Sequence, residues 1–189
     1  MVGWIILGVV LVLILALVIW FIGVYNKLVK ARNRVKNSWS QIDVQLTTRF
    51  DLIPNLVETV KGYANHEKGI FEEFAKARNV YAQASEKGNV AGMSEANNML
   101  SATLSRLIAV SEAYPELKAN TNFSSLMEKL TETESKIAYA RQFYNDVVTT
   151  YNDMREVFPS SLVAGMFNFA EAELFKAEEA SRQNVKVQF

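Results

Sequence analysis

The chain begins with an uninterrupted apolar run and then changes to a repeating pattern of apolar positions. From Val2 to Val24 no residue is charged, and only glycine interrupts the apolar side chains. At ~1.5 Å of rise per residue, a helix of this length spans a ~30 Å hydrocarbon layer. Aromatic residues of the kind that favour membrane interfaces stand near its two ends: Trp4, Trp20 and Tyr25. The pattern predicts a transmembrane anchor over residues 1–24.

A cleaved signal peptide is the alternative interpretation of this run. Such a peptide has a basic start, a shorter apolar stretch and a small-residue exit of the A-x-A type. Residues 1–24 show none of these features. We therefore expect the segment to be retained as an anchor.

After the anchor, apolar residues recur at seven-residue spacing in two interleaved series. One series is Leu28, Val35, Ile42, Arg49, Leu56 and Tyr63, and the other is Arg32, Trp39, Leu46, Ile53 and Val60. A seam of this kind is typical of helices that pack as coiled coils do. It predicts one helix over residues 25–64, ~60 Å long, that continues the transmembrane helix without a break.

A second seam of the same spacing covers residues 123–157 and ends before Pro159. Its members are Phe123, Leu126, Leu130, Thr133, Ile137, Ala140, Tyr144, Val147, Tyr151, Met154 and Phe158, of which only Thr133 is polar. Two shorter helices are expected between the seams. One contains Ile70, Phe74, Ala77, Tyr81 and Ala84; after a loop over residues 85–92, Ser94 caps the other, which contains Leu100, Leu104, Leu107 and Val110.

The predicted fold is all-α. A single N-terminal transmembrane helix continues into an elongated antiparallel bundle of about four main helices, with a short C-terminal helix and an extended tail. Up-down-up-down connectivity with short turns is the economical arrangement. The bundle covers residues 25–182, and the tail covers residues 183–189. Its end, "VKVQF", alternates as a half-buried strand does, so it either frays or pairs with an adjacent subunit.

An antiparallel bundle brings the segment after Phe158 back to the bilayer. This segment has large apolar residues in quick succession: Leu162, Val163, Met166, Phe167 and Phe169. Either it covers the open end of the bundle, or it contacts lipid or a neighbouring subunit. Periodicity alone does not choose between these roles.

The charged residues predict how the anchor is oriented. Five cations follow the apolar run with no acid before Asp43, and no lysine or arginine precedes it; they are Lys27, Lys30, Arg32, Arg34 and Lys36. This asymmetry predicts an N-terminus outside and a cytoplasmic body. The same cations are expected at the membrane interface, where they either set the topology alone or also attract anionic lipid.

The overall composition excludes several classes of function. Lysine plus arginine equals aspartate plus glutamate at 20 each, so no basic surface predicts a nucleic-acid partner. Cysteine is absent, which excludes disulfides, thiolate nucleophiles and zinc sites that need sulfur.

His66, the only histidine, is the first candidate for chemistry. A zinc-protease H-E-x-x-H motif fails because Ile70 stands where the second histidine is needed, and a di-iron E-x-x-H motif fails because Tyr63 replaces the glutamate. We therefore expect no catalytic residue, no metal site and no cofactor.

Arg49 of the first seam and Pro54, which lies near it in the chain, have structural interpretations. Arg49 falls on the core-facing series, so a carboxylate from another helix, Glu112 or Glu134, is expected to pair with it and to fix the register of the bundle. Pro54 should kink its helix because its ring crowds the carbonyl of Phe50. The kink either wraps the helix around its partners or acts as a hinge.

Long stretches of the sequence resemble the LemA family. They are "YNKLVKARNRVKNSWSQIDVQLTTRFDLIPNLVETVKGYANHE", "LIAVSEAYPELKANTNFSSLM", "ESKIAYARQFYNDVVTTYNDMREVFPSSLVAGMFNF" and "VKVQF". The resemblance implies a bacterial inner-membrane protein with one N-terminal membrane helix and an all-helical body. It carries over no catalytic residues, and it narrows the fold more than the function.

Three functional hypotheses follow. The first is a noncatalytic scaffold, anchored in the bilayer, whose copies associate side by side as homo-oligomers. The second is an adaptor or sensor that binds another membrane protein, such as a protease or signalling enzyme. An enzyme that uses carboxylates alone as acid and base is the third, and the failed motif search argues against it.

Overall fold

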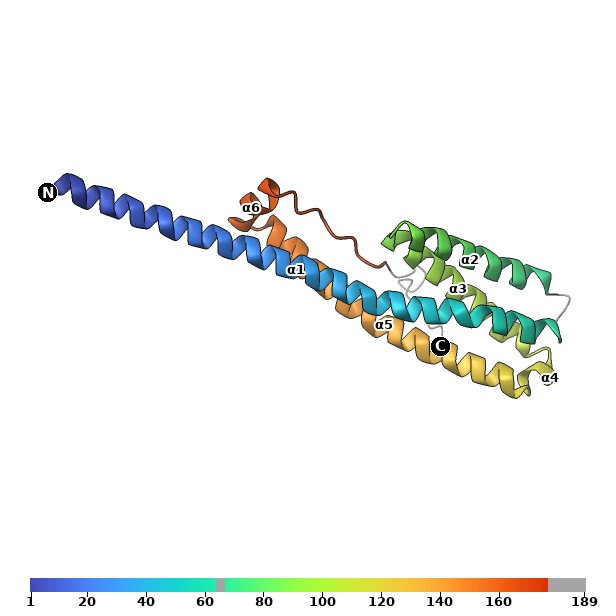
Figure 1. Ribbon diagram of the computed structural model, residues 1–189. Helices are drawn as coiled ribbons and strands as arrows, with labels where there is room; N and C mark the ends of the chain where they lie inside the picture. Colours follow the sequence, from blue (N-terminus) through green and yellow to red (C-terminus); the bar gives the residue numbers. More distant parts are fainter. Residues whose placement is uncertain (64–66, 177–189) are drawn as a thin grey trace, which may run out of the picture.

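A single helix, α1 (Val2–Lys61), joins the apolar N-terminal run to the rest of the molecule (Figure 1). The computed structural model describes residues 1–63 and 67–176. The apolar run and the first seam therefore form one unbroken helix, as predicted, and α1 continues through Pro54. Its first buried residue is Leu28, so the core begins only after the apolar run has ended.

The second long helix, α5 (Thr121–Glu156), returns antiparallel beside α1 (Figure 1). Most heptad residues of the two helices are buried, among them Leu28, Val35, Ile42 and Leu46 from α1, and Leu130, Ile137, Tyr144 and Tyr151 from α5. The last member of each predicted seam is exposed, Tyr63 at 37% and Phe158 at 75%, because α1 and α5 end before these positions. The polar member of the second seam, Thr133, is also buried, and its hydroxyl donates to the carbonyl of Lys129 at 2.7 Å. The pairing of the two predicted seams is confirmed.

Two shorter helices, α2 (Lys68–Glu86) and α3 (Val90–Ser111), form a hairpin against the half of α1 and α5 that lies farther from the N-terminus (Figure 1). The apolar residues predicted for α2 are all buried. Tyr81 stacks on Phe50 of α1 with ring centroids 4.2 Å apart, and its hydroxyl lies 3.0 Å from that of Thr47. A short helix, α4 (Pro115–Lys118), then leads to α5. The predicted up-down-up-down bundle is therefore correct.

The predicted start of α3 is wrong. Ser94 does not cap this helix, because α3 begins at Val90 and Asn89 is its cap, with its side chain accepting from the amide of Gly92 at 3.0 Å. Ser94 lies inside the helix, buried, and its hydroxyl donates to the carbonyl of Lys176. Two residues near the N-terminus of a helix can both satisfy the capping pattern, and tertiary packing decides between them.

The C-terminal part of the described chain is a short helix followed by an extended segment. Helix α6 (Ser160–Met166) lies beside α1 at the end of the bundle nearest the N-terminus (Figure 1). Residues 169–176, called the strap below, then run back along the bundle without forming a helix. Among residues 1–63 and 67–176 no strand is present. The predicted tail, residues 183–189, lies outside the described residues.

Candidate membrane-proximal interaction site

The apolar run of α1 projects from the bundle with its side chains uncovered. It is the stretch of the described chain that is long and apolar enough to cross a membrane. Its large residues are exposed, including Trp4 at 80% and Trp20 at 40%. Apolar surface of this extent is unfavourable in water and matches the interior of a bilayer.

An aromatic cluster forms where the bundle first covers α1. The ring of Phe167 lies 4.7 Å from that of Tyr25 and 5.9 Å from that of Phe21. Phe169, at the start of the strap, lies 5.9 Å from Tyr25, and the Arg32 guanidinium lies 5.1 Å from its ring centroid. Offset aromatic pairs and a cation over a ring each add to the burial of apolar area. The cluster therefore fixes the C-terminal segment to α1 immediately after the apolar run.

An exposed apolar edge flanks this cluster, and we call it the membrane-proximal edge. It consists of Val157, Phe158, Leu162, Met166 and Phe167, which are 59%, 75%, 58%, 69% and 47% exposed. Val157 and Phe158 line a cavity of about 300 Å³ together with Trp20 and Val24 of α1. The edge therefore lies at the height where the apolar run ends, and it stays uncovered by the described part of the chain.

The structure separates the residues predicted to contact lipid or a neighbour into two groups. Leu162, Met166 and Phe167 are exposed. Val163 and Phe169 are 0% and 5% exposed, so the prediction differs from the structure for these two. Val163 faces inward because α6 buries one side against α1 and α5, and Phe169 faces inward because it packs on Tyr25 and Arg32. The density of apolar residues alone does not reveal these directions.

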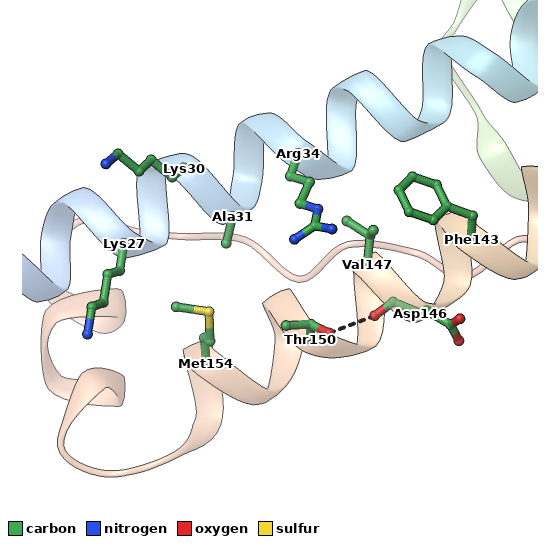
Figure 2. Close-up of a pocket in the computed structure, with 9 residues that line it drawn as sticks. All are labelled: Lys27, Lys30, Ala31, Arg34, Phe143, Asp146, Val147, Thr150 and Met154. Atoms are coloured by element: carbon green, nitrogen blue, oxygen red, sulfur yellow. Dashed lines mark hydrogen bonds between the residues drawn. The ribbon is translucent and has the colours of Figure 1, made fainter.

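The residues predicted at the membrane interface fall into three groups, which lie in the aromatic cluster, in a groove or at the surface. Tyr25 and Arg32 pack into the aromatic cluster. Lys27, Lys30 and Arg34 line a groove between α1 and α5 (Figure 2). Lys36 is exposed.

The strap is held on α5 by a repeated pair of side chains. Asn152 donates to the carbonyl of Ala172 at 2.9 Å and accepts from its amide at 3.0 Å. Asn145 makes the same two bonds with Phe175, at 3.1 and 2.9 Å. The hydroxyls of the preceding tyrosines donate to strap carbonyls: Tyr151 to Ala170 at 2.7 Å and Tyr144 to Glu173 at 2.8 Å. The strap is therefore recognised largely through its backbone.

Sequence reasoning missed this contact, although the sequence contains a signal for it. The triplet Tyr-Asn-Asp occurs at residues 144–146 and again at residues 151–153, seven positions apart. Repetition at a heptad spacing places both pairs on one side of a helix. Burial raises the pKa of Tyr144 to about 12, so its hydroxyl stays protonated as a donor at neutral pH.

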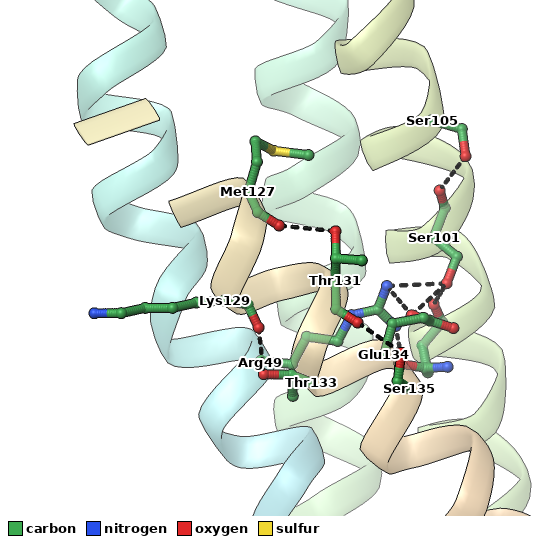
Figure 3. A network of polar contacts seen from close by, with 10 residues as sticks. Arg49, Ser101, Ser105, Met127, Lys129, Thr131, Thr133, Glu134 and Ser135 are labelled. Atoms are coloured by element: carbon green, nitrogen blue, oxygen red, sulfur yellow. Dashed lines mark hydrogen bonds and ion pairs between the residues drawn. The ribbon is translucent and has the colours of Figure 1, made fainter. Parts of the chain in front are cut away.

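A buried polar contact joins three helices in the half of the bundle that lies farther from the N-terminus (Figure 3). Arg49 of α1 is 2% exposed and pairs with Glu134 of α5. Its guanidinium also donates to Asn97 and, at 3.1 Å, to Ser101 of α3. Burial lowers the pKa of Arg49, and the carboxylate of Glu134 opposes this shift. The arrangement fixes register because the buried charge has its partners in only one alignment of the helices.

The alternative partner proposed for Arg49 is not used. Glu112 pairs with Lys118 at 2.7 Å at the surface near α4. It follows the last residue of α3, Ser111, whereas Ser101, which contacts Arg49, lies ten positions earlier on the same helix. Glu112 is therefore about 15 Å too far along the axis to reach Arg49.

The described residues contain no group of three or more histidine, cysteine, aspartate or glutamate side chains that could hold a metal ion. His66 lies outside the described residues. Arg49 lies in the packed interior of the bundle, and its hydrogen bonds and its ion pair with the half-exposed Glu134 are made within the chain. These contacts give the buried polar residues a structural role, which is to hold the helices together.

A comparison with known proteins shows that most of the chain matches the model of one protein family. The model of the LemA family matches residues 38–189. The match covers α2 to α6 and the greater part of the second half of α1.

The individual relatives are only 22–26% identical to the chain. The chain is 26% identical to magnetosome protein MamQ 1 and to MamQ 2 of Paramagnetospirillum magneticum, over 82% of its own length and 66% of theirs. It is 22% identical to protein LemA of Metamycoplasma hominis, over 87% of its own length and 74% of that protein. The chain thus spans about two thirds of the MamQ proteins that it matches.

Proposed function

The chain belongs to the LemA family, and from this premise we propose that it is a noncatalytic membrane-anchored scaffold whose copies associate side by side in the bacterial inner membrane. The anchor is the apolar run of α1. The body stands on the cytoplasmic side, since five cations follow the run directly.

The membrane-proximal edge is the observation that carries this proposal. Its side chains are apolar and exposed on a body whose other apolar residues are largely paired in the core. Contiguous apolar surface on a folded chain is typical of a protein or membrane contact. The anchor holds this edge at the same height above the membrane in every copy. Copies that diffuse in one membrane can therefore meet edge to edge.

The elongated pair α1 and α5 suits a scaffold rather than an enzyme. The polar groups that converge in the core hold helices in register, and the aromatic groups hold the strap and α6 in place. The buried charge of Arg49 is used in contacts between helices, which supports a structural role for the polar core.

Chemical cross-linking of the full-length protein in native membranes tests the proposal. The wild-type protein should give a ladder of dimers and larger species. The double variant Leu162→Glu, Met166→Glu should lose most of the ladder, because it places two charges on the exposed edge. Phe167 is less suitable for this test because it also packs on Tyr25.

Ile108→Glu is the matched control, since Ile108 is 49% exposed on α3, far from the edge. It should leave the ladder intact. A clean monomer for the wild-type protein would contradict the proposal. A single cross-linked band that contains a different protein would favour the adaptor hypothesis instead.

A further inference from the structure

A groove runs between α1 and α5 immediately above the end of the apolar run. Figure 2 shows three cations around it, Lys27, Lys30 and Arg34, all from α1. Ala31, Val147 and Met154 form its apolar floor, and its volume is about 420 Å³. The strap passes along the other side of α5, where it bonds to Asn145 and Asn152, so the groove remains open.

The groove is continuous with the level of the membrane. Lys27 and Met154 line both this groove and the cavity of about 300 Å³ that contains Trp20 and Val24. The two cavities therefore adjoin, and the path along them is mainly apolar beside the anchor and is lined by cations beyond it. A molecule that fills it must have the same polarity: an apolar part beside Trp20 and an anionic part beside the cations.

The heights of the cations suit a lipid headgroup. At ~1.5 Å of rise per residue, Lys27 lies ~5 Å and Arg34 ~15 Å beyond Val24 along the axis, and the headgroup layer is ~5–8 Å thick. Side chains on a helix lean toward its N-terminus, which for α1 is the membrane end. In Figure 2 the Arg34 side chain points from α1 across the groove toward α5, so its guanidinium faces a phosphate held in the groove.

The charge of the groove is net positive. Asp146 is the acid among the lining residues, and in Figure 2 its carboxylate points away from the groove. The hydroxyl of Thr150 donates to the carbonyl of Asp146 at 2.8 Å and adds no charge. Cations beside an apolar floor at the membrane level are the chemistry that recognises an anionic phospholipid.

We propose that the groove between α1 and α5 is a binding site for one anionic phospholipid, with its acyl chain beside Trp20 and Val24 and its phosphate among Lys27, Lys30 and Arg34. This inference rests on the membrane anchor of the proposed function. The groove that would hold the phosphate shares no residue with the membrane-proximal edge, whereas Val157 and Phe158 of the edge line the cavity beside Trp20 and Val24. Variants on the phosphate side therefore test the lipid site separately from self-association.

Quenching of Trp20 by brominated lipid tests the site in the full-length protein. Trp4 is replaced by Phe, and Trp39 stays, because it lies ~22 Å beyond Val24 and bromine on acyl chains does not reach it. The protein is reconstituted in vesicles that contain either brominated phosphatidylglycerol or brominated phosphatidylcholine at equal mole fraction. Stronger quenching by the anionic lipid is expected, and its titration gives a relative association constant.

Variants of two neighbouring cations distinguish a defined binding site from general attraction of anionic lipid to the basic surface. Arg34→Gln should lower the relative association constant about fivefold, because it removes one cation that contacts the phosphate. Lys36→Gln removes the same charge two positions farther along α1, outside the groove, and should change the constant less than twofold. Equal losses for both variants would overturn the proposal in favour of diffuse electrostatics.

A variant that keeps every charge provides the second test. Thr150→Phe places a ring in the groove and should abolish the preference for the anionic lipid, whereas Thr149→Phe, one position away and outside the lining, should preserve it. Equal quenching of Trp20 by both lipids in the parent protein would overturn the lipid site alone. Absence of quenching by either lipid would show that α1 does not enter the bilayer and would overturn the anchor as well.

Discussion

Arg49 and Glu134 form one ion pair, but their surroundings differ. The side chain of Arg49 is 2% exposed, whereas that of Glu134 is 45% exposed. A charge that loses its partner is costly in the interior and inexpensive where water reaches it. The two ends of the same contact should therefore respond differently to substitution.

Glu134→Ala should lower the free energy of unfolding by about 3 kcal/mol, because it leaves a buried guanidinium without its counter-charge. Arg49→Met should cost about 1 kcal/mol, since Glu134 then turns to water and an apolar side chain fills the core. Urea unfolding of the full-length protein in detergent, followed by the fluorescence of Trp39, gives both values. A larger loss for Arg49→Met would contradict the assignment of burial.

Tyr144 gives a prediction about alkaline stability. Its pKa is raised from 10.0 to about 12 in the folded protein, chiefly by burial. The folded state therefore holds this proton more tightly than the unfolded chain does. The resulting stability is fully present below pH 10 and is lost as the pH rises toward 12.

Tyr144→Phe should lower the free energy of unfolding by about 1 kcal/mol at neutral pH, through loss of the bond to Glu173. It should also reduce the alkaline loss of stability. Part of that loss should remain, because burial raises the pKa of Tyr81 and of Tyr151 as well. Unfolding curves between pH 7 and 12, read against the 10.0-to-12 window of Tyr144, measure both effects; an unchanged alkaline slope would contradict the account.

At the scale of elements, the α2–α3 hairpin depends on a close approach at Gly92. A Cβ atom at this position would lie 2.9 Å from the Cβ of Ala84. Gly92→Ala should therefore destabilise the protein by about 1–3 kcal/mol, as overpacking does. Adding Ala84→Gly should recover part of this loss, although glycine inside α2 itself costs about 1 kcal/mol.

Gly165→Ala is the matched control, because a Cβ there meets nothing within 4 Å. It should be neutral or slightly stabilising, since alanine favours a helix. The midpoint of thermal unfolding of each variant, in the same detergent, provides the comparison. A neutral Gly92→Ala would contradict the close packing of the hairpin.

The strap depends on two asparagine side chains. Asn145→Leu removes both bonds to Phe175 and should expose the Phe175 amide to solvent exchange, while the Ala172 amide stays protected by Asn152. Asn152→Leu should give the reverse pattern. Hydrogen exchange resolved to these two amides measures the effect. Protection unchanged in both variants would show that the side chains do not hold the strap.

The helices of the bundle were readable from the sequence because their apolar residues repeat every seven positions. The two seams identified α1 and α5, and the glycine and proline positions bounded the shorter helices. The predicted cap of α3, Ser94, lies five residues after the observed cap, Asn89, because capping residues are frequent near a helix end and only packing selects one. The strap was missed because side chains that bind backbone carry no apolar period.

The predicted site was less complete than the predicted fold. The density of apolar residues in the segment from Leu162 to Phe169 was visible in the sequence, but not which of them face inward. Val163 and Phe169 are buried against the two long helices. Helix α5 comes just before them in the chain, but α1 lies more than 100 positions earlier. The groove beside Lys27 and Arg34 needs both long helices, so neither seam alone reveals it.

At the scale of the whole molecule, the chain is a rod with its interaction residues gathered near one end. The apolar run projects from the bundle, and α6 lies beside its base (Figure 1), where Phe167 packs on Tyr25. The Arg49 contact lies toward the other end, where α3 joins α1 and α5. The edge and the groove thus lie next to the end of the anchor, whereas the Arg49 contact lies in the distal half of the bundle.

Site-specific disulfide formation in native membranes tests the central claim most directly. The chain has no cysteine, so Met166→Cys introduces a single thiol on the membrane-proximal edge, and Ile108→Cys introduces one at a distant exposed position. If copies associate through the edge, mild oxidation should give a covalent dimer of Met166→Cys and little dimer of Ile108→Cys at equal abundance. Equal dimer for both variants, or none for Met166→Cys, would contradict lateral association through this edge.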